Sequence, residues 1–206
     1  MISFSVPDGK SFFNFKVERG RVMFAGSRYG SVSRQVCSGL ITQLGKLGFA
    51  FLTGCANGVD ESFRVALAES EYAGSSLAAC AFKERVDRVR GIYPLFVVPE
   101  GLHPKVALAK RTLWMTSRCS LLILFPESLA SATLSKRAQG LAWGKGSTLA
   151  FKSAIHNNKP VFVVSETRPD ESSLYTVLPS SLFGVVRGYW CIPPVYAETG
   201  LCYEAV

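Results

Sequence analysis

The fold of this chain is decided by residues 49–60, which read Phe49-Ala50-Phe51-Leu52-Thr53-Gly54-Cys55-Ala56-Asn57-Gly58-Val59-Asp60. Residues 49–53 form a short apolar run, as in a buried strand. Gly54 and Gly58 then bracket small residues that let the backbone turn tightly. Apolar residues resume after Asp60. The stretch therefore predicts a strand, a glycine turn and a helix that starts just after Gly58.

The same pattern is repeated on both sides of this stretch. Residues 21–25 form an apolar run that ends at Gly26, and apolar positions at helical spacing predict a helix over residues 31–46, stopped by Gly48. The further predicted elements are strands at residues 77–82, Leu121–Phe125 and 160–164, and helices at residues 106–117 and 147–157. Strands and helices that alternate with short connections predict an α/β fold, a Rossmann-like open parallel sheet with helices on both faces.

The two ends of the chain fit this pattern less closely. Residues 3–17 alternate weakly and predict an edge strand or a hairpin, while residues 182–186 and 189–192 are strand-like. A chain of 206 residues builds one core and is short for two ordinary domains. We therefore expect a single domain over residues 1–206, with a Rossmann-like core at about 20–166 and terminal additions at 1–19 and 167–206.

Composition narrows the class of protein. Hydrophobic residues make up 48% of the chain, yet the longest apolar runs are strand length and fall short of the roughly 20 residues of a membrane helix. Residues 1–6 lack the basic start of a signal peptide. We expect a cytoplasmic protein that contacts no membrane.

The charge balance is basic. Lys and Arg number 23 against 15 Asp and Glu, which gives a formal net charge of +8. Such a balance favours polyanionic partners without specifying a site. The densest basic clusters are Lys83, Arg85, Arg88 and Arg90; Lys105, Lys110, Arg111 and Arg118; and Lys136, Arg137 and Lys145. Each cluster alone is typical of a solvated helix face.

The six cysteines do not form a metal-binding pattern. No Cys-x-x-Cys pair occurs and the chain has two histidines, which disfavours structural zinc, and we expect no metal and no cofactor. Cys37, Cys80 and Cys119 lie in apolar contexts and are predicted to be small buried hydrophobes. Cys191 and Cys202 are close enough in sequence to be bridged, but a cytoplasmic setting favours free thiols.

Three turns in the sequence suit phosphate. They are Gly26-Ser27-Arg28, residues 53–60, and Gly144-Lys145-Gly146-Ser147-Thr148. In an open parallel sheet such turns meet at one edge, where backbone N–H groups and helix N-termini hold anions. Asp60 at a helix start either caps N–H groups or binds a ligand hydroxyl. The candidate binding residues are Gly26, Ser27, Arg28, Gly54, Asn57, Gly58, Asp60, Lys110, Arg111, Lys145, Gly146, Ser147 and Thr148.

From residue 22 to residue 164 the order of these motifs resembles the Rossmann-like domain of the DNA-processing protein family DprA, also called SMF. Phe24-Ala25-Gly26-Ser27-Arg28 is similar to the family's Gly-Ser/Thr-Arg turn, and residues 53–60 are similar to its Ser-Gly-x-Ala-x-Gly-Ile-Asp signature. Three further segments match in the right order. They are Arg85-Val86-Asp87-Arg88 with Tyr93-Pro94, the basic element Lys110-Arg111-Thr112, which lacks one family arginine, and residues 144–147 through 160–163.

The resemblance implies a single-stranded DNA-binding recombination mediator that helps to load RecA. It also favours a homodimer, as does the apolar C-terminal segment, although that segment alternatively completes the core. In this interpretation Arg28, Lys110, Arg111 and Lys145 contact backbone phosphates. Tyr29, Tyr93 and Trp114 are base-stacking candidates, and each is equally a core or rim residue.

Two other functions compete with DNA binding. The glycine turns also suit a receptor for a nucleotide or nucleotide-derived signal, with Asp60 on a ribose hydroxyl. The LOG-type nucleotide hydrolases of the wider superfamily carry a Gly-Gly-x-Gly-Thr-x-x-Glu motif, but residues 144–151 contain no carboxylate. Asp60 and Glu61 are better explained as a helix cap and a solvated residue than as an acid or base. N-glycoside hydrolysis is therefore disfavoured, no catalytic residue is assigned, and DNA binding leads.

Overall fold

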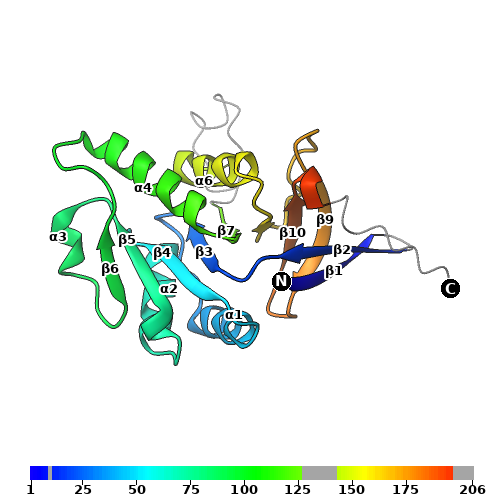
Figure 1. Ribbon diagram of the computed structural model, residues 1–206, viewed down its shortest axis with the longest axis horizontal. Helices are drawn as coiled ribbons and strands as arrows, with labels where there is room; N and C mark the ends of the chain where they lie inside the picture. The colour runs from blue at the N-terminus through cyan, green and yellow to red at the C-terminus, as the bar shows by residue number, and fades with distance from the viewer. Residues whose placement is uncertain (9–10, 127–142, 197–206) are drawn as a thin grey trace.

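The computed structural model describes residues 1–8, 11–126 and 143–196 (Figure 1). They form a two-stranded hairpin, β1 (Ile2–Asp8) and β2 (Ser11–Val17), followed by an eight-stranded sheet with helices. The elements after the hairpin are, in chain order, β3 (Arg21–Gly26), α1 (Arg34–Lys46), β4 (Ala50–Gly54), α2 (Val59–Ala68), a short 3-10 helix (Ala73–Ser75), β5 (Ser76–Cys80), α3 (Lys83–Val86), β6 (Tyr93–Phe96), α4 (Pro104–Arg118), β7 (Leu121–Phe125), α6 (Lys145–His156), β8 (Val161–Val163), β9 (Thr176–Leu182), β10 (Val186–Ile192) and a second 3-10 helix (Pro194–Tyr196).

The large sheet has the strand order β6-β5-β4-β3-β7-β8-β10-β9. The first six of these strands pair in parallel. The chain builds outward from β3 to β6 and then crosses back to β7, so the order reverses between β3 and β7. This confirms the predicted Rossmann-like α/β fold and places its topological switch point between the ends of β3 and β7.

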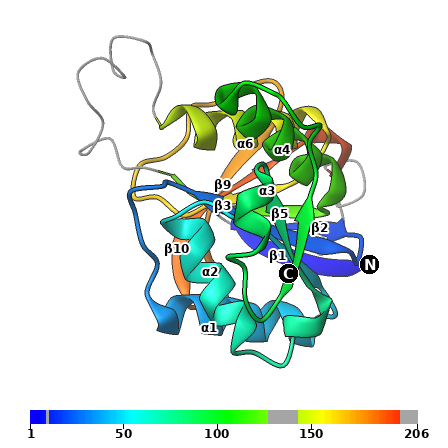
Figure 2. The same ribbon diagram turned by 90° about the vertical axis from the view of Figure 1, so that its left-hand side faces the viewer.

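Helices cover both faces of the sheet (Figure 2). Alternate strand residues pack on opposite sides. Val22 and Phe24 of β3 belong to the core beneath α1 and α2. Met23 and Ala25 belong to the core beneath α4 and α6. The apolar run of each parallel strand is explained by this two-sided burial.

The C-terminal segment extends the sheet. β10 pairs antiparallel with β8 and with β9, which gives the sheet a mixed edge. The strand predicted at residues 182–186 is wrong, because the hairpin turn lies there: Phe183 and Gly184 have φ values of 54° and 70°. Residues 176–192 do form two strands, but the chain turns back at residues 183–185, where the apolar pattern predicts a continuous strand.

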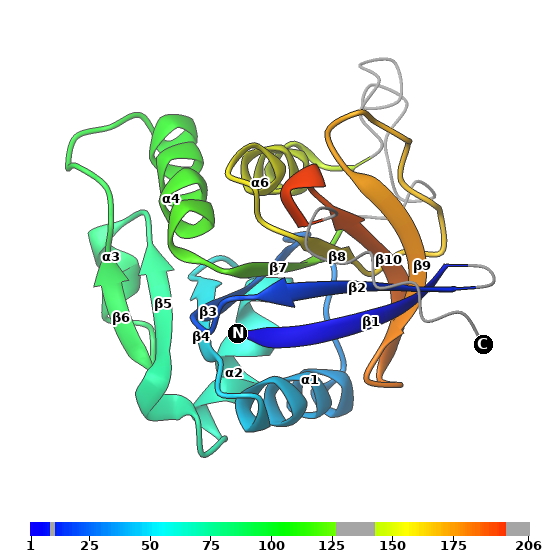
Figure 3. The same ribbon diagram turned by 45° about the vertical axis from the view of Figure 1, so that its right-hand side comes forward.

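The N-terminal segment forms the hairpin alternative, not an edge strand of the large sheet. It lies beside β9 and β10 (Figure 3). The rings of Phe4 and Phe15 pack against Trp190 of β10, with centroids 5.2 and 5.0 Å from the indole. The hairpin therefore shares the core beneath α1 and α2.

Local differences from the predicted elements are small. β6 was not predicted, because Tyr93-Pro94 opens it; proline is tolerated there since β6 is an edge strand. Two of the predicted features lie outside the described residues: the basic residues Lys136 and Arg137, and Cys202 of the bridge considered between Cys191 and Cys202. No helix of the described ranges has the length and apolar character needed to cross a membrane.

Candidate functional site at the switch point

The first two glycine turns touch each other at the carboxyl ends of β3 and β4. The Ser27 N–H donates to Phe125 O at 3.0 Å, and the Val59 N–H donates to Ser27 O at 3.1 Å. Gly58 has a φ of 76°, and a Cβ there would collide with the backbone of Ser27 and Arg28. Glycine is therefore required at this close approach. These bonds tie both turns to the switch point.

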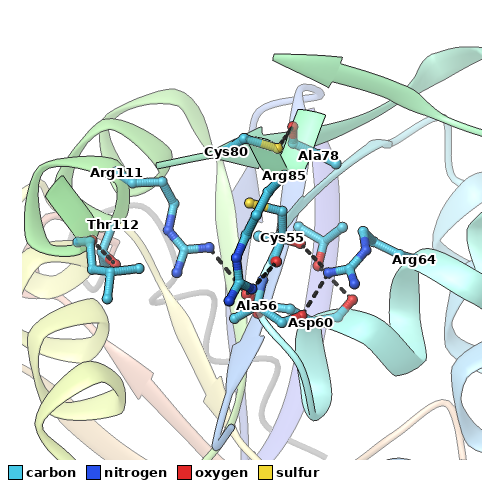
Figure 4. A network of polar contacts seen from close by, with 12 residues as sticks. Cys55, Ala56, Asp60, Arg64, Ala78, Cys80, Arg85, Arg111 and Thr112 are labelled. Carbon is cyan, nitrogen blue, oxygen red and sulfur yellow. Dashed lines mark hydrogen bonds and ion pairs between the residues drawn. The ribbon is translucent and has the colours of Figure 1, made fainter. Parts of the chain in front are cut away.

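Two arginines hold the backbone of residues 54–56 (Figure 4). Arg64 Nη1 donates to Gly54 O at 2.9 Å and to Ala56 O at 2.8 Å. Arg85 Nη1 donates to Cys55 O at 2.7 Å. Charge-assisted bonds of this kind are about twice as strong as neutral ones, so the loop is held in one shape.

A buried ion pair closes the same site. Arg111 Nη1 lies 3.1 Å from Asp60 Oδ2, and the two side chains are 11% and 8% exposed. Asp60 Oδ2 also accepts at 3.3 Å from the Ala56 N–H, which lies in the loop before α2, so this bond holds the loop and does not cap the helix. Gly54 leaves no room for a Cβ between the guanidinium and the carboxylate. Arg111 Nε is buried and has no hydrogen-bond partner among the described residues.

Two cysteine thiols adjoin this pair. The pKa of Cys55 is lowered to about 6, first by a hydrogen bond from Cys80 and in addition by the Ala81 N–H and the Arg111 charge. Burial acts in the opposite direction. The partner thiol moves the other way, since its hydrogen bond to Cys55 and its burial raise the pKa of Cys80. Cys55 is thus the more acidic thiol of the pair.

The helix N-termini differ in how they are capped. α1 is capped by Ser33 Oγ, which accepts from the Val36 N–H, and α4 by His103 Nδ1, which accepts from the Lys105 N–H. α2 and α6 instead have Gly58 and Gly144 as their N-cap residues, which have no side chain to cap the first turn. The first N–H groups of a helix have no partner within it. At α2 the Val59 N–H is taken by Ser27 O and the first turn carries Asp60 and Glu61, so the N-terminus of α6 is the better suited of the two to an anion.

The remaining predicted residues occupy more scattered positions. Arg28, Asn57, Lys110 and Lys145 are exposed, whereas Ser147 is buried in the first turn of α6. Thr148 Oγ1 donates to Trp143 O at 3.4 Å, and Gly146 has open space around it. Within residues 1–8, 11–126 and 143–196, no hydrogen bond or ion pair joins Lys110 or Lys145 to residues 54–60. The structure thus unites the first two turns with Asp60 and Arg111.

A surface groove of about 470 Å³ runs beside this cluster, between residues 28–34 and helix α2. Arg28, Gly58 and Glu61 line it together with Tyr29, whose side chain is largely exposed. Arg34 at its rim pairs with Glu69 at 2.8 Å. The groove offers a cation and an aromatic ring next to the α2 N-terminus.

Sequence reasoning missed two features of the site. Arg64 was not selected, although its position four residues after Asp60 places both on one face of α2. The Cys55–Cys80 contact was also missed, because it depends on strand pairing. Among the described residues no three His, Cys, Asp or Glu side chains gather as a metal site would require.

Comparisons with known proteins point to one fold. No family model and no curated protein matches the sequence. The structure of DNA processing protein A (DprA) from Streptococcus pneumoniae matches with a TM-score of 0.51 and 18% identity over 81% of this chain. DprA from Helicobacter pylori matches with a TM-score of 0.51 and 16% identity over 82% of this chain and 83% of its own. The chain spans 63% of the S. pneumoniae protein. It therefore has a DprA-like fold.

Proposed function

We propose that this chain binds single-stranded DNA through the phosphate backbone, at the carboxyl edge of the parallel sheet. The observation that carries the proposal is the N-terminus of α6, which follows Gly144 without a side-chain cap or a carboxylate in its first turn, in a fold whose ligands bind at this edge. The exposed cations Arg28, Lys110 and Lys145 supply positive charge from the turn after β3, from α4 and from the start of α6. The net charge of +8 favours a polyanion.

The comparisons support the same class of ligand. The H. pylori structure concerns the mode in which that DprA binds single-stranded DNA. In the present chain Arg111 is committed to Asp60, so we assign it to holding residues 54–60 in place. Arg28, Lys110 and Lys145 are the residues proposed to contact phosphates.

Fluorescence anisotropy with a labelled single-stranded oligonucleotide across a salt series tests this proposal. The unmodified chain should bind less tightly as salt rises, with a log–log slope of about −0.7 per phosphate contact. A variant with Arg28, Lys110 and Lys145 replaced by Ala should bind more weakly and lose about 2 from the slope, if each residue makes one contact.

A matched control removes the same charge elsewhere. Lys16, Lys46 and Arg187 are exposed on β2, α1 and β10, away from the proposed site. Their triple Ala variant should keep the salt slope of the unmodified chain. Equal losses in both triple variants would mean that net charge alone drives binding, and would contradict the assigned site.

A nucleotide ligand is the second candidate. The groove beside α2 favours it, since its volume of about 470 Å³ suits a mononucleotide and Tyr29 offers a ring for a base. No carboxylate lies in the first turn of α6, which argues against LOG-type hydrolysis. Absence of oligonucleotide binding at low salt, together with saturable binding of a nucleoside monophosphate in calorimetry, would select this candidate.

As further parts of the DNA proposal, we propose that the chain forms a homodimer and helps to load a RecA-type recombinase. The segment considered for dimerisation contributes Trp190 and Ile192 to the core, which favours a structural role for much of it. We further propose that residues 1–206 form one domain, because the N-terminal hairpin and the C-terminal strands share the core of the Rossmann-like sheet. A cytoplasmic location is a separate part of the proposal.

A further inference from the structure

Cys55 and Cys80 lie opposite each other at the carboxyl ends of β4 and β5. In the parallel ladder Gly54 pairs with Ala79, so the next residues along the two strands are the two cysteines. Neighbouring strands are about 4.8 Å apart. That spacing falls within the Cα separation of about 4.4–6.8 Å that a disulfide requires. The strand register therefore places the two cysteines next to each other at the ends of neighbouring strands.

The side chains complete this geometry. Both belong to the core beneath α1 and α2, and Figure 4 shows their sulfur atoms close together. The S–H of Cys80 faces two acceptors, Ala78 O at 3.7 Å and the Cys55 sulfur. Both thiols are free.

The two thiols have different reactivities. The lowered pKa of Cys55 favours its thiolate, the form that reacts with peroxides. Burial raises the pKa of Cys37, Cys119 and Cys191 to about 12. Cys55 retains 7% exposure while Cys80 has none, which makes Cys55 the attacking thiol and Cys80 the resolving thiol.

We propose that Cys55 and Cys80 are a peroxide-sensitive pair that oxidises to an intramolecular disulfide. The Cys55 thiolate attacks one oxygen of hydrogen peroxide and breaks the O–O bond; this forms a sulfenic acid and releases hydroxide, which is protonated to water. The Cys80 sulfur then attacks the sulfenic sulfur, and the displaced hydroxyl leaves with the Cys80 proton as a second water. Two thiols and one peroxide thus yield one disulfide and two waters. The proposal does not depend on DNA binding.

Peptide mapping after peroxide treatment tests the proposal. The reduced full chain is exposed to hydrogen peroxide, its remaining thiols are alkylated under denaturing conditions, and it is digested with trypsin. Cleavage after Lys46, Arg64 and Lys83 puts the two cysteines on separate peptides, 47–64 and 65–83. Mass spectrometry should find these two peptides linked. Free thiols at both positions, or a link from either cysteine to another, would overturn the proposal.

Two variants and a control assign the roles. Cys80→Ala should leave the Cys55 sulfenic acid unresolved, so that dimedone labels peptide 47–64. Cys55→Ser should show neither the label nor the link. Cys119→Ala, a matched loss of a buried thiol elsewhere, should form the 47–64 to 65–83 link as the unmodified chain does. Dimedone labelling at another cysteine in Cys80→Ala, with Cys55 unlabelled, would also overturn the assignment.

Discussion

Asp60 and Arg111 show how one residue pair can hold the loop between β4 and α2 in place. They lie 51 positions apart in the chain and meet at the carboxyl edge of the sheet. The carboxylate also receives the Ala56 N–H, so it links helix α2, helix α4 and the loop that precedes α2. Replacing buried ion pairs is often tolerated when both charges are removed, whereas removing one partner leaves a buried charge uncompensated.

We therefore expect Arg111→Met to lower the free energy of unfolding by about 3 kcal/mol. The double variant Asp60→Asn with Arg111→Met should recover much of this loss, because neither charge is then left unpaired. Urea denaturation followed by circular dichroism measures both. An Arg111→Met variant as stable as the unmodified chain would show that the pair does not hold the loop.

Within the strands and helices, Gly54 and Gly146 differ in how much space surrounds their Cα atoms. Gly54 ends β4 against the Asp60–Arg111 pair, and a methyl group there would overlap both side chains. Gly146 lies in the first turn of α6, where a methyl group would meet nothing within 4 Å. The first glycine is required by packing, and the second is not.

We expect Gly54→Ala to destabilise the protein by about 3 kcal/mol, through overpacking and displacement of the ion pair. Gly146→Ala should instead stabilise it by about 0.5 kcal/mol, because alanine favours the helix. The difference between their midpoints of urea denaturation measures this contrast. Similar midpoints would mean that the ion pair accommodates the added methyl group at little cost.

Trp190 of β10 connects the N-terminal hairpin and the C-terminal strands, the two terminal additions, to the Rossmann-like core. Its indole is buried and contacts Phe4 and Phe15 of the hairpin and Phe162 of β8. The additions therefore share one core with the parallel sheet, and they should unfold together with it.

Trp190→Ala should cost about 3–5 kcal/mol of stability, whereas Trp190→Phe should cost less, because a ring still packs against the hairpin. In either variant Trp114 and Trp143, which pack on the opposite face of the sheet, still report on the core by fluorescence. Unfolding followed by fluorescence and by circular dichroism should coincide. Two separate transitions would show that the terminal additions unfold independently.

Much of the parallel core was predictable because its signals are local. Leu121–Phe125 was predicted residue for residue, since a short apolar run ended by proline has few alternatives. The glycine turns after β3 and β4 were placed correctly, as was the start of helix α2. Element ends elsewhere shifted by one to three residues, which reflects how weakly sequence marks helix and strand limits.

Local patterns of residues were enough to predict the α/β class, all the parallel strands except β6, and the glycine turns after β3 and β4, because strand and helix periods and glycine turns are properties of neighbouring residues. The folded chain was needed to show that Arg111 is committed to Asp60, that Arg64 holds the loop, that the C-terminal strands complete the sheet and that Cys55 faces Cys80. These contacts join residues from different elements, and their partners are set by strand order and packing, which local patterns do not encode.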